Sequence, residues 1–196
     1  MSDQDAPVRL KNRRLVARNR VFSAYLDDLE GPDGCTVRDY LSVVPSGIDA
    51  EGVSGVAVLP ESDGRLALIN VYRHPLGASL WEVPRGFVDP DEQPNDAAVR
   101  ELKEETGLAV SADRLLPLGI VAPEPGLIAA RVRLFVALGC EQTGRPLAAE
   151  LGHTETRFFT LTQIDEEIAK ERIQDPCTLV AYLLYCRHQT AKSSDR

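Results

Sequence analysis

The stretch from residue 86 to residue 108, GFVDPDEQPNDAAVRELKEETGL, constrains the fold of this chain more than any other. A short loop that begins at a glycine leads into a charged segment rich in helix formers, and a second glycine closes it. The spacing therefore predicts a loop, a helix and a helix end in fixed register. The positions that define it are Gly86, Glu92, Arg100, Glu101, Glu104, Glu105 and Gly107.

The second half of this stretch predicts a helix over residues 97–106. Pro94 followed by Asn95 or Asp96 marks its start, because Asn and Asp side chains accept hydrogen bonds from exposed backbone N–H groups. Gly107 can adopt the left-handed conformation that ends a helix. The side of the helix expected to pack inward carries Ala98, Val99 and Leu102.

Three carboxylates lie on an arc beside that inward side. Glu101 and Glu105 are four residues apart, and Glu104 lies on the other flank of Glu101. Like charges at this spacing destabilise a helix by about 0.2–0.5 kcal/mol per pair. A divalent cation would reverse that effect, since Mg²⁺ prefers oxygen ligands and joins one or two carboxylates to substrate phosphates. Arg100 can hold the carboxylates in place by pairing with Glu92 or Glu104.

All the fixed positions of this stretch match the Nudix box, and the chain resembles the Nudix hydrolases, which cleave nucleoside diphosphates linked to another group. The alternative, a solvated acidic helix face, would suit a bare E-x-x-E-E but leaves the glycines and Arg100 unexplained. The resemblance implies an α/β fold, the Nudix α/β/α sandwich with a mixed sheet, over residues 51–190. An N-terminal antiparallel β subdomain would occupy residues 1–50, and residues 191–196 would form a frayed tail.

The remainder of the chain alternates apolar runs with turn signals, which predicts mixed α/β structure. Turns are expected at residues 31–34 and 61–64, and helices at residues 161–171 and 178–188. The expected strands cover residues 14–29, 37–44, 52–60, 65–72, 80–83, 115–123, 131–140 and 157–161.

Composition excludes several classes of protein. The 196 residues, 43% of them apolar, are enough for one main domain with a sizeable core. A net charge of −8 argues against broad binding to nucleic acid or to an anionic membrane. No apolar run reaches the length of a membrane span, and the first residues lack the apolar core of a signal peptide. The four scattered cysteines lack metal-ligand spacing and favour reduced thiols, so we expect a cytoplasmic protein.

The segments flanking the box resemble those of ADP-ribose pyrophosphatases. Residues 71–73, VYR, and 80–86, LWEVPRG, are similar to the family's Q-Y-R and E-L-P-A-G segments. Residues 123–126, PEPG, and 134–137, LFVA, are similar to its P-S-P-G and L-F-L-A segments. Two positions depart from the family pattern. Arg85 stands where alanine is usual, and residues 127–130 lack the usual acid, for which Glu124 or Glu150 is the alternative.

The resemblance implies roles for individual residues. Metal ligands would be Glu101, Glu104, Glu105 and the backbone carbonyl of Arg85, holding Mg²⁺ or, alternatively, Mn²⁺. Glu105, Glu104 and Arg100 would serve catalysis, and the general base stays open between Glu105, Glu104, Glu124 and a metal-bound hydroxide. Substrate contacts would come from Arg73, Glu82, Phe87 and Glu124, although Arg73 as a surface arginine and Phe87 as a core residue are alternatives.

The same resemblance implies a nucleotide-sugar substrate, with ADP-ribose giving AMP and ribose 5-phosphate. It also implies a homodimer, in which the N-terminal strands would complete the pocket of the partner subunit. Two alternatives stay open: hydrolysis of another dinucleotide or nucleoside diphosphate derivative, and a nucleotide-sensing module without catalysis.

Overall fold

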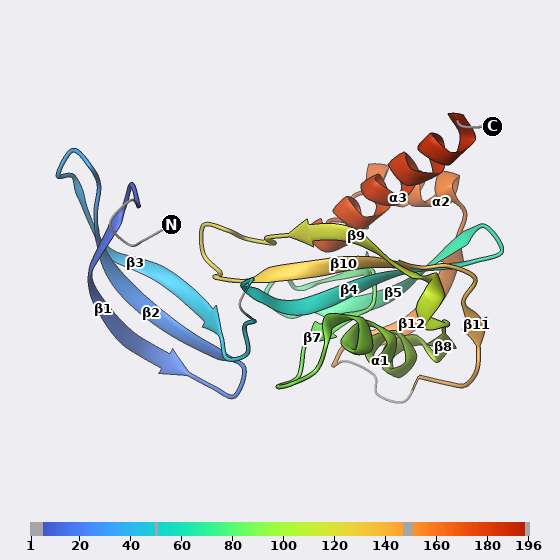
Figure 1. The fold of residues 1–196 in the computed structure, drawn as a ribbon, viewed down its shortest axis with the longest axis horizontal. Helices are drawn as coiled ribbons and strands as arrows, with labels where there is room; N and C mark the ends of the chain where they lie inside the picture. The colour runs from blue at the N-terminus through green and yellow to red at the C-terminus, as the bar shows by residue number, and fades with distance from the viewer. Residues whose placement is uncertain (1–5, 50, 147–150, 195–196) are drawn as a thin grey trace. The chain divides into compact units, whose positions relative to one another are not determined.

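The computed structural model describes residues 6–49, 51–146 and 151–194. The chain divides into two compact units, each of which is described by itself (Figure 1). The first unit comprises Met1–Ser54 together with the loop Glu124–Ala130, and the second comprises Gly55–Pro123 together with Arg131–Arg196. Among the described residues, no helix is both long and apolar enough to cross a membrane.

The first unit is a three-stranded antiparallel sheet in the order β1 (Arg9–Arg18), β2 (Phe22–Glu30) and β3 (Thr36–Pro45). The prediction of one strand over residues 14–29 is wrong, because the chain reverses between β1 and β2. The side chain of Asn19 accepts from the backbone N–H groups of Val21 and Phe22 at 2.9 and 2.7 Å. This side-chain turn needs neither glycine nor proline, so the usual turn signals are missing. The turn predicted at residues 31–34 is confirmed by the hydrogen bond from Gly34 N–H to the Gly31 carbonyl, 3.1 Å long.

Two further contacts organise this unit. Asp27 is buried and accepts two hydrogen bonds from Arg13, each 2.8 Å long, and one from Ser42. The Arg13 guanidinium holds the pKa of Asp27 below its usual value. At the edge of β3, Val43 forms a parallel bridge with Ile128, so the sheet holds the loop of residues 124–130. This is the loop in which the expected acid is missing.

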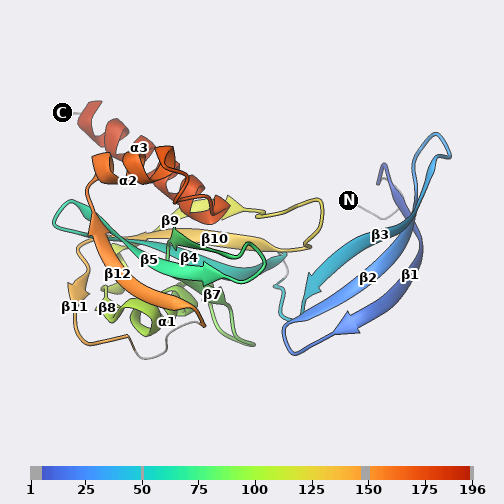
Figure 2. The ribbon, with the colours of Figure 1, turned by 180° about the vertical axis from the view of Figure 1, so that it is seen from behind.

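The second unit is built on a seven-stranded sheet in the order β12, β5, β4, β10, β9, with β6 paired to β5 and β7 paired to β4. A separate pair joins β8 to β11, and a 3-10 turn lies at Ala112–Arg114. Figure 2 shows the sheet from behind, with its helices on both faces. The strands are β4 (Val53–Ser62), β5 (Arg65–Arg73), β6 (Ala78–Glu82), β7 (Arg85–Phe87), β8 (Leu108–Ala109), β9 (Leu115–Val121), β10 (Arg131–Ala137), β11 (Glu141–Gln142) and β12 (His153–Phe159).

Each face of the sheet has its own core, because side chains of a strand alternate between the faces. On β4, Ala57 and Leu59 join the core that includes Ile164 of α2 (Leu161–Ala169) and residues of α3 (Pro176–Ser194). The intervening Val56 and Val58 join the core beneath α1 (Pro94–Thr106). In both views α1 lies on one face of the sheet and α2 with α3 on the other (Figures 1 and 2). The predicted α/β fold class, with an α/β/α sandwich, is confirmed.

Helix α1 begins at Pro94 as predicted, but its cap differs from the prediction. The residue before it, Gln93, is the N-cap and makes no side-chain capping bond, so neither Asn95 nor Asp96 caps the helix. Because Pro94 supplies a preset φ and lacks an N–H that would need a partner, the helix can start without a capping side chain. Gly107 ends the helix in the left-handed conformation (φ 71°), as predicted.

The C-terminal helices differ in length from the predictions. Helix α2 ends two residues earlier than expected, and α3 starts two residues earlier and continues to Ser194. Residues 191–194, predicted as a frayed tail, are therefore helical, whereas residues 195–196 lie outside the described part of the chain. The early start of α3 follows from its cap: the Asp175 carboxylate accepts from the backbone N–H and the hydroxyl of Thr178 at 2.9 and 2.8 Å.

The buried side of α1 generates a test of this fold. Leu102 is fully buried, so Leu102→Ala should lower the free energy of unfolding by about 2–5 kcal/mol through lost burial and the cavity left behind. Urea denaturation measures this change. The matched control is Leu183→Ala on α3, which is 56% exposed and should change stability by no more than about 0.5 kcal/mol. Equal effects of the two substitutions would contradict the assignment of the α1 core.

Candidate active site

Strand β7 lies between β4 and α1, and glycines make this close approach possible. Residues Gly55, Val56 and Ala57 of β4 pair with Phe87, Gly86 and Arg85. A β-carbon at Gly55 would lie 2.8 Å from the Gly86 carbonyl oxygen, and one at Gly86 would overlap the Glu101 carboxylate. The box therefore begins with glycine because the helix carboxylate lies directly against the strand backbone.

Two carboxylates of α1 face this short strand. Glu101 lies against Gly86, and Glu105 accepts a hydrogen bond from the backbone N–H of Arg85 at 2.9 Å. Both side chains are largely removed from solvent, with Glu105 only 5% exposed. Glu104 lies on the outer flank and is more exposed. The predicted arc of three carboxylates thus divides into an inner pair, Glu101 and Glu105, and an outer member.

Arg100 holds the charged residues of the box in place. Its guanidinium forms two hydrogen bonds with Glu92, at 2.9 and 2.8 Å, and one with Glu101 at 2.6 Å. It also donates to the Phe87 carbonyl at 3.0 Å, and its contact with Glu104 is longer, at 3.4 Å. Of the two partners proposed from the sequence, Glu92 is therefore the close one. Glu92 in turn accepts from the N–H of Asp89 and so fastens the loop before the helix.

The two acids that Arg100 contacts respond differently to their surroundings. Burial raises the pKa of Glu101, and the hydrogen bond from Arg100 opposes this rise only in part. Glu92 has its pKa lowered, chiefly by its bonds to Arg100. The pKa of Arg100 is raised by the same contacts. Glu101 is thus a carboxylate whose negative charge is incompletely compensated by the protein, which favours a cation beside it.

The donor atoms at this position suit a hard divalent cation. Glu101, Glu104 and Glu105 offer only oxygen ligands, and the inner pair lies against one segment of backbone. Within residues 6–49, 51–146 and 151–194, no three His, Cys, Asp or Glu side chains converge as a ready-made metal site. Mg²⁺ commonly uses one or two carboxylates and completes its shell with water and substrate phosphates, so the inner pair fits such an ion.

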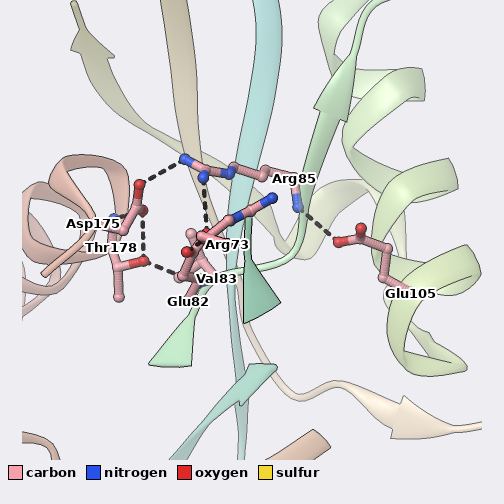
Figure 3. A network of polar contacts seen from close by, with 7 residues as sticks. All are labelled: Arg73, Glu82, Val83, Arg85, Glu105, Asp175 and Thr178. Atoms are coloured by element: carbon pink, nitrogen blue, oxygen red, sulfur yellow. Dashed lines mark hydrogen bonds and ion pairs between the residues drawn. The ribbon is translucent and has the colours of Figure 1, made fainter. Parts of the chain in front are cut away.

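A second polar network lies on the other side of β7 (Figure 3). Glu82 is almost completely buried and accepts from Arg73 at 2.9 and 2.6 Å and from Arg85 at 2.8 Å. Arg85 also donates to Asp175 at 2.6 Å. Burial alone would lower the pKa of Arg85, but the carboxylates of Asp175 and Glu82 outweigh it and raise the pKa. The Arg85 side chain therefore points to these two acids rather than to solvent.

A pocket of about 330 Å³ opens beside this network. Arg73, Glu82, Arg85 and Asp175 form its charged part, and the remaining wall is largely apolar. A space with charged groups at one side and apolar groups at the other can accept a ligand with a polar and an apolar part. The other lining residues are Pro75, Leu76, Leu80, Gln174 and Pro176.

The remaining candidate residues from the sequence are Phe87, Glu124 and Glu150. Phe87 is 40% exposed, so the alternative that it belongs to the core is wrong. Trp81 packs in the core, edge-on to Phe159 with ring centroids 4.9 Å apart. Glu124 belongs to the first compact unit, where its carbonyl accepts from the N–H groups of residues 127 and 128. Glu150 lies outside the described residues.

Sequence reasoning missed the part that Asp175 plays at this site. The run Asp175-Pro176-Cys177-Thr178 before an apolar segment is a helix-start signal, with a capping acid and proline at the first helical position. That signal could have predicted the cap of α3. It could not have predicted the ion pair with Arg85, because the two residues are ninety positions apart in the chain.

Comparison with known proteins places the chain among proteins of this architecture. The family model described as NUDIX domain matches residues 51–178. The chain is 30% identical over 169 residues to the methanol dehydrogenase activator of Bacillus methanolicus, covering 85% of each chain. It is 36% identical over 157 residues to the ADP-sugar pyrophosphatase of Mus musculus, covering 74% of this chain and 71% of the relative.

A solved structure described as an ADP compounds hydrolase has a similar fold. It matches with a TM-score of 0.77 and covers 95% of this chain and 96% of its own. The sequence identity is 21%, so the match bears on the fold alone. It includes the N-terminal strands as well as the sandwich.

The contacts of Arg100 generate a test of the site. Arg100→Lys keeps the positive charge but loses the planar fork that holds Glu92, so Glu101 and the preceding loop should be less well positioned. Activity should fall by about 10–100-fold, the range seen when groups that orient metal ligands are changed. Initial rates at saturating divalent metal measure the loss. Lys103→Met, at an exposed position of the same helix, is the control, and a rate for Arg100→Lys equal to that of this control would refute the role.

Proposed function

Because the chain belongs to the Nudix family and is a hydrolase of that family, we propose that it cleaves the pyrophosphate bond of a nucleoside diphosphate sugar, with Mg²⁺ as cofactor. The proposed substrate is ADP-ribose, which would give AMP and ribose 5-phosphate. One observation carries the proposal: Glu101 and Glu105 are held side by side against the Arg85–Gly86 backbone at the start of the box.

The choice of substrate rests on two kinds of support. The segments around Arg73, around Arg85 and over residues 123–126 resemble those of ADP-ribose pyrophosphatases. A relative that shares 36% of its aligned residues is an ADP-sugar pyrophosphatase. Substrates of this class join an adenosine diphosphate to a sugar, and the pocket beside Arg73 offers both charged and apolar contacts to such a group.

The chemistry of the reaction explains why the box carries so many acids. A pyrophosphate resists attack because its oxygens repel an incoming nucleophile. Divalent metal ions bound here would neutralise phosphate charge and lower the pKa of water. Glu101 and Glu105 would hold the metal, with Glu104 and the Arg85 carbonyl as further ligands. Within the second unit, Glu105 or Glu104 would accept the proton of the attacking water.

The substrate contacts follow from the second network. Arg73 is held by Glu82 through two parallel hydrogen bonds, which fixes the plane of its guanidinium. We propose that Arg73 contacts a substrate phosphate, while Glu82 braces it or contacts a sugar hydroxyl. Phe87, being partly exposed, would line the cleft.

The four cysteines bear on the compartment. All four are free thiols, and burial raises the pKa of both Cys140 and Cys177 to about 11. Such buried thiols are unreactive, which suits a protein of a reducing compartment. We therefore propose that the protein is cytoplasmic.

A substrate panel tests the reaction. ADP-ribose, other nucleotide sugars and diadenosine polyphosphates are offered with Mg²⁺, and the release of AMP and phosphosugar is measured by chromatography. We expect ADP-ribose to be cleaved fastest, and Glu105→Gln to reduce kcat by about 100-fold or more through loss of a metal ligand or of the proton acceptor. Glu166→Gln, at an exposed position on α2, should behave as the wild type. Binding of ligand without turnover of any substrate would instead favour a sensing module.

We further propose a homodimer, in which the first unit completes the pocket of a partner subunit. Strand β1 is exposed along its whole length, and an open edge strand is a ready surface for pairing. The first unit also exposes several large apolar side chains, each 37–51% exposed, which favours contact with another surface. They are Val8, Leu10, Leu15, Val16, Val37, Tyr40 and Leu41.

Light scattering tests the dimer. We expect a mass of about twice the 21.5 kDa of one chain. Leu41→Glu should lower the mass toward that of the monomer at low protein concentration, because it places a charge in an apolar contact surface. Leu183→Glu, at an exposed position on α3, is the control and should leave the mass unchanged. A single-chain mass for the wild type at all concentrations would rule out the dimer.

A further inference from the structure

The segment of residues 83–85 connects the start of α3 with the inner carboxylates of α1. Val83 donates its backbone N–H to the Thr178 hydroxyl at 3.0 Å, and Arg85 donates its guanidinium to Asp175 at 2.6 Å. On its other side, Arg85 donates its backbone N–H to Glu105 at 2.9 Å (Figure 3). One residue therefore contacts the cap of α3 through its side chain and the candidate metal site through its main chain.

Asp175 has two tasks in this arrangement, and its two oxygens divide them. Oδ2 accepts from Thr178 and caps α3, while Oδ1 accepts from Arg85. Asp175 is 7% exposed, and Glu82, the other carboxylate that pairs with Arg85, is 1% exposed. The Arg85 side chain is 27% exposed, so the pair joins a partly exposed guanidinium to nearly buried carboxylates, and removing Arg85 would leave the Asp175 charge buried without this partner.

We propose that Arg85 and Asp175 are positioning residues for the metal site: the α3 cap holds the Arg85 guanidinium, which fixes the backbone segment that contacts Glu105. The inference rests on the proposed function, because it assumes that Glu105 binds the metal. This role would explain why Arg85 stands at the position where ADP-ribose pyrophosphatases usually have alanine. In this chain, the strength of metal binding depends on a contact with the last helix.

The alternative is that the ion pair only stabilises the fold. Both roles predict a lower melting temperature when it is broken, so stability alone does not distinguish them. Metal affinity does, because a bond that merely ties α3 to the sheet has no reason to change the binding of an ion at α1. Asp175→Asn keeps the cap, since asparagine caps a helix as well as aspartate does, and removes the charge that faces Arg85.

The experiment measures binding of Mn²⁺ alone, without substrate, by isothermal titration calorimetry. Variants are Arg85→Met, Asp175→Asn and the double variant. Each single substitution should weaken Mn²⁺ binding about 10-fold or more, as changes to groups that orient metal ligands do. The double variant should be no weaker than the weaker single variant, because both substitutions break one contact. Arg85→Lys, which keeps a charge facing Asp175, should restore part of the affinity and serves where Arg85→Met is poorly folded.

Two controls separate the possible failures. Arg172→Met breaks the ion pair of Arg172 with Glu167 of α2, which is outside the Arg85 network, and any change in melting temperature should come without a change in Mn²⁺ affinity. Glu105→Gln tests the metal site itself. If Glu105→Gln leaves Mn²⁺ binding unchanged, the proposed function fails at its metal site. If Glu105→Gln weakens binding while Arg85→Met and Asp175→Asn bind as the wild type does, the positioning role alone is overturned.

Discussion

The close approach of β7 to α1 is the constraint on which the candidate site depends. Only glycine at position 86 leaves room for the Glu101 carboxylate against the strand backbone, and Gly55 gives the same strand room on its other side. Strand β7 pairs with β4 of the sheet on one side and lies against α1 on the other, so little space is left on either side of it. The carboxylates are positioned because α1 packs on the core beneath it, to which Ala98 and Leu102 belong.

Placing acids in this position costs stability, and Arg100 offsets only part of that cost. Its guanidinium satisfies Glu92 fully and reaches Glu101 with one nitrogen, while burial still raises the pKa of Glu101. A group whose charged form is disfavoured in the folded state weakens folding at neutral pH, and a bound cation would remove that penalty. The site is therefore most stable in the state that the proposed reaction requires.

The sequence was informative where local chemistry decides the structure and less so where contacts are distant. Spacing within residues 86–108 predicted the helix, its glycine end and the inward side of Ala98, Val99 and Leu102, because helix periodicity is a local property. The turn at Asn19 was missed, because a side chain in place of glycine or proline reverses the chain there. Arg85 had no predictable partner, because its acids come from β6 and from the start of α3, which only the folded chain brings together.

The network around Arg85 illustrates why a departure from a family pattern needs compensation. Without acidic partners, the guanidinium of Arg85 would be a partly buried positive charge beside that of Arg73, and this arrangement would destabilise the fold. Glu82 and Asp175 supply two carboxylates for the guanidinium groups of Arg73 and Arg85, so this cluster of four side chains is balanced in charge. Balance of this kind ties residues from β5, β6, β7 and α3 into one unit. Through Arg85 this network reaches the backbone that contacts Glu105, so under the proposed positioning role the charge of Asp175, far from the box in sequence, bears on the metal site.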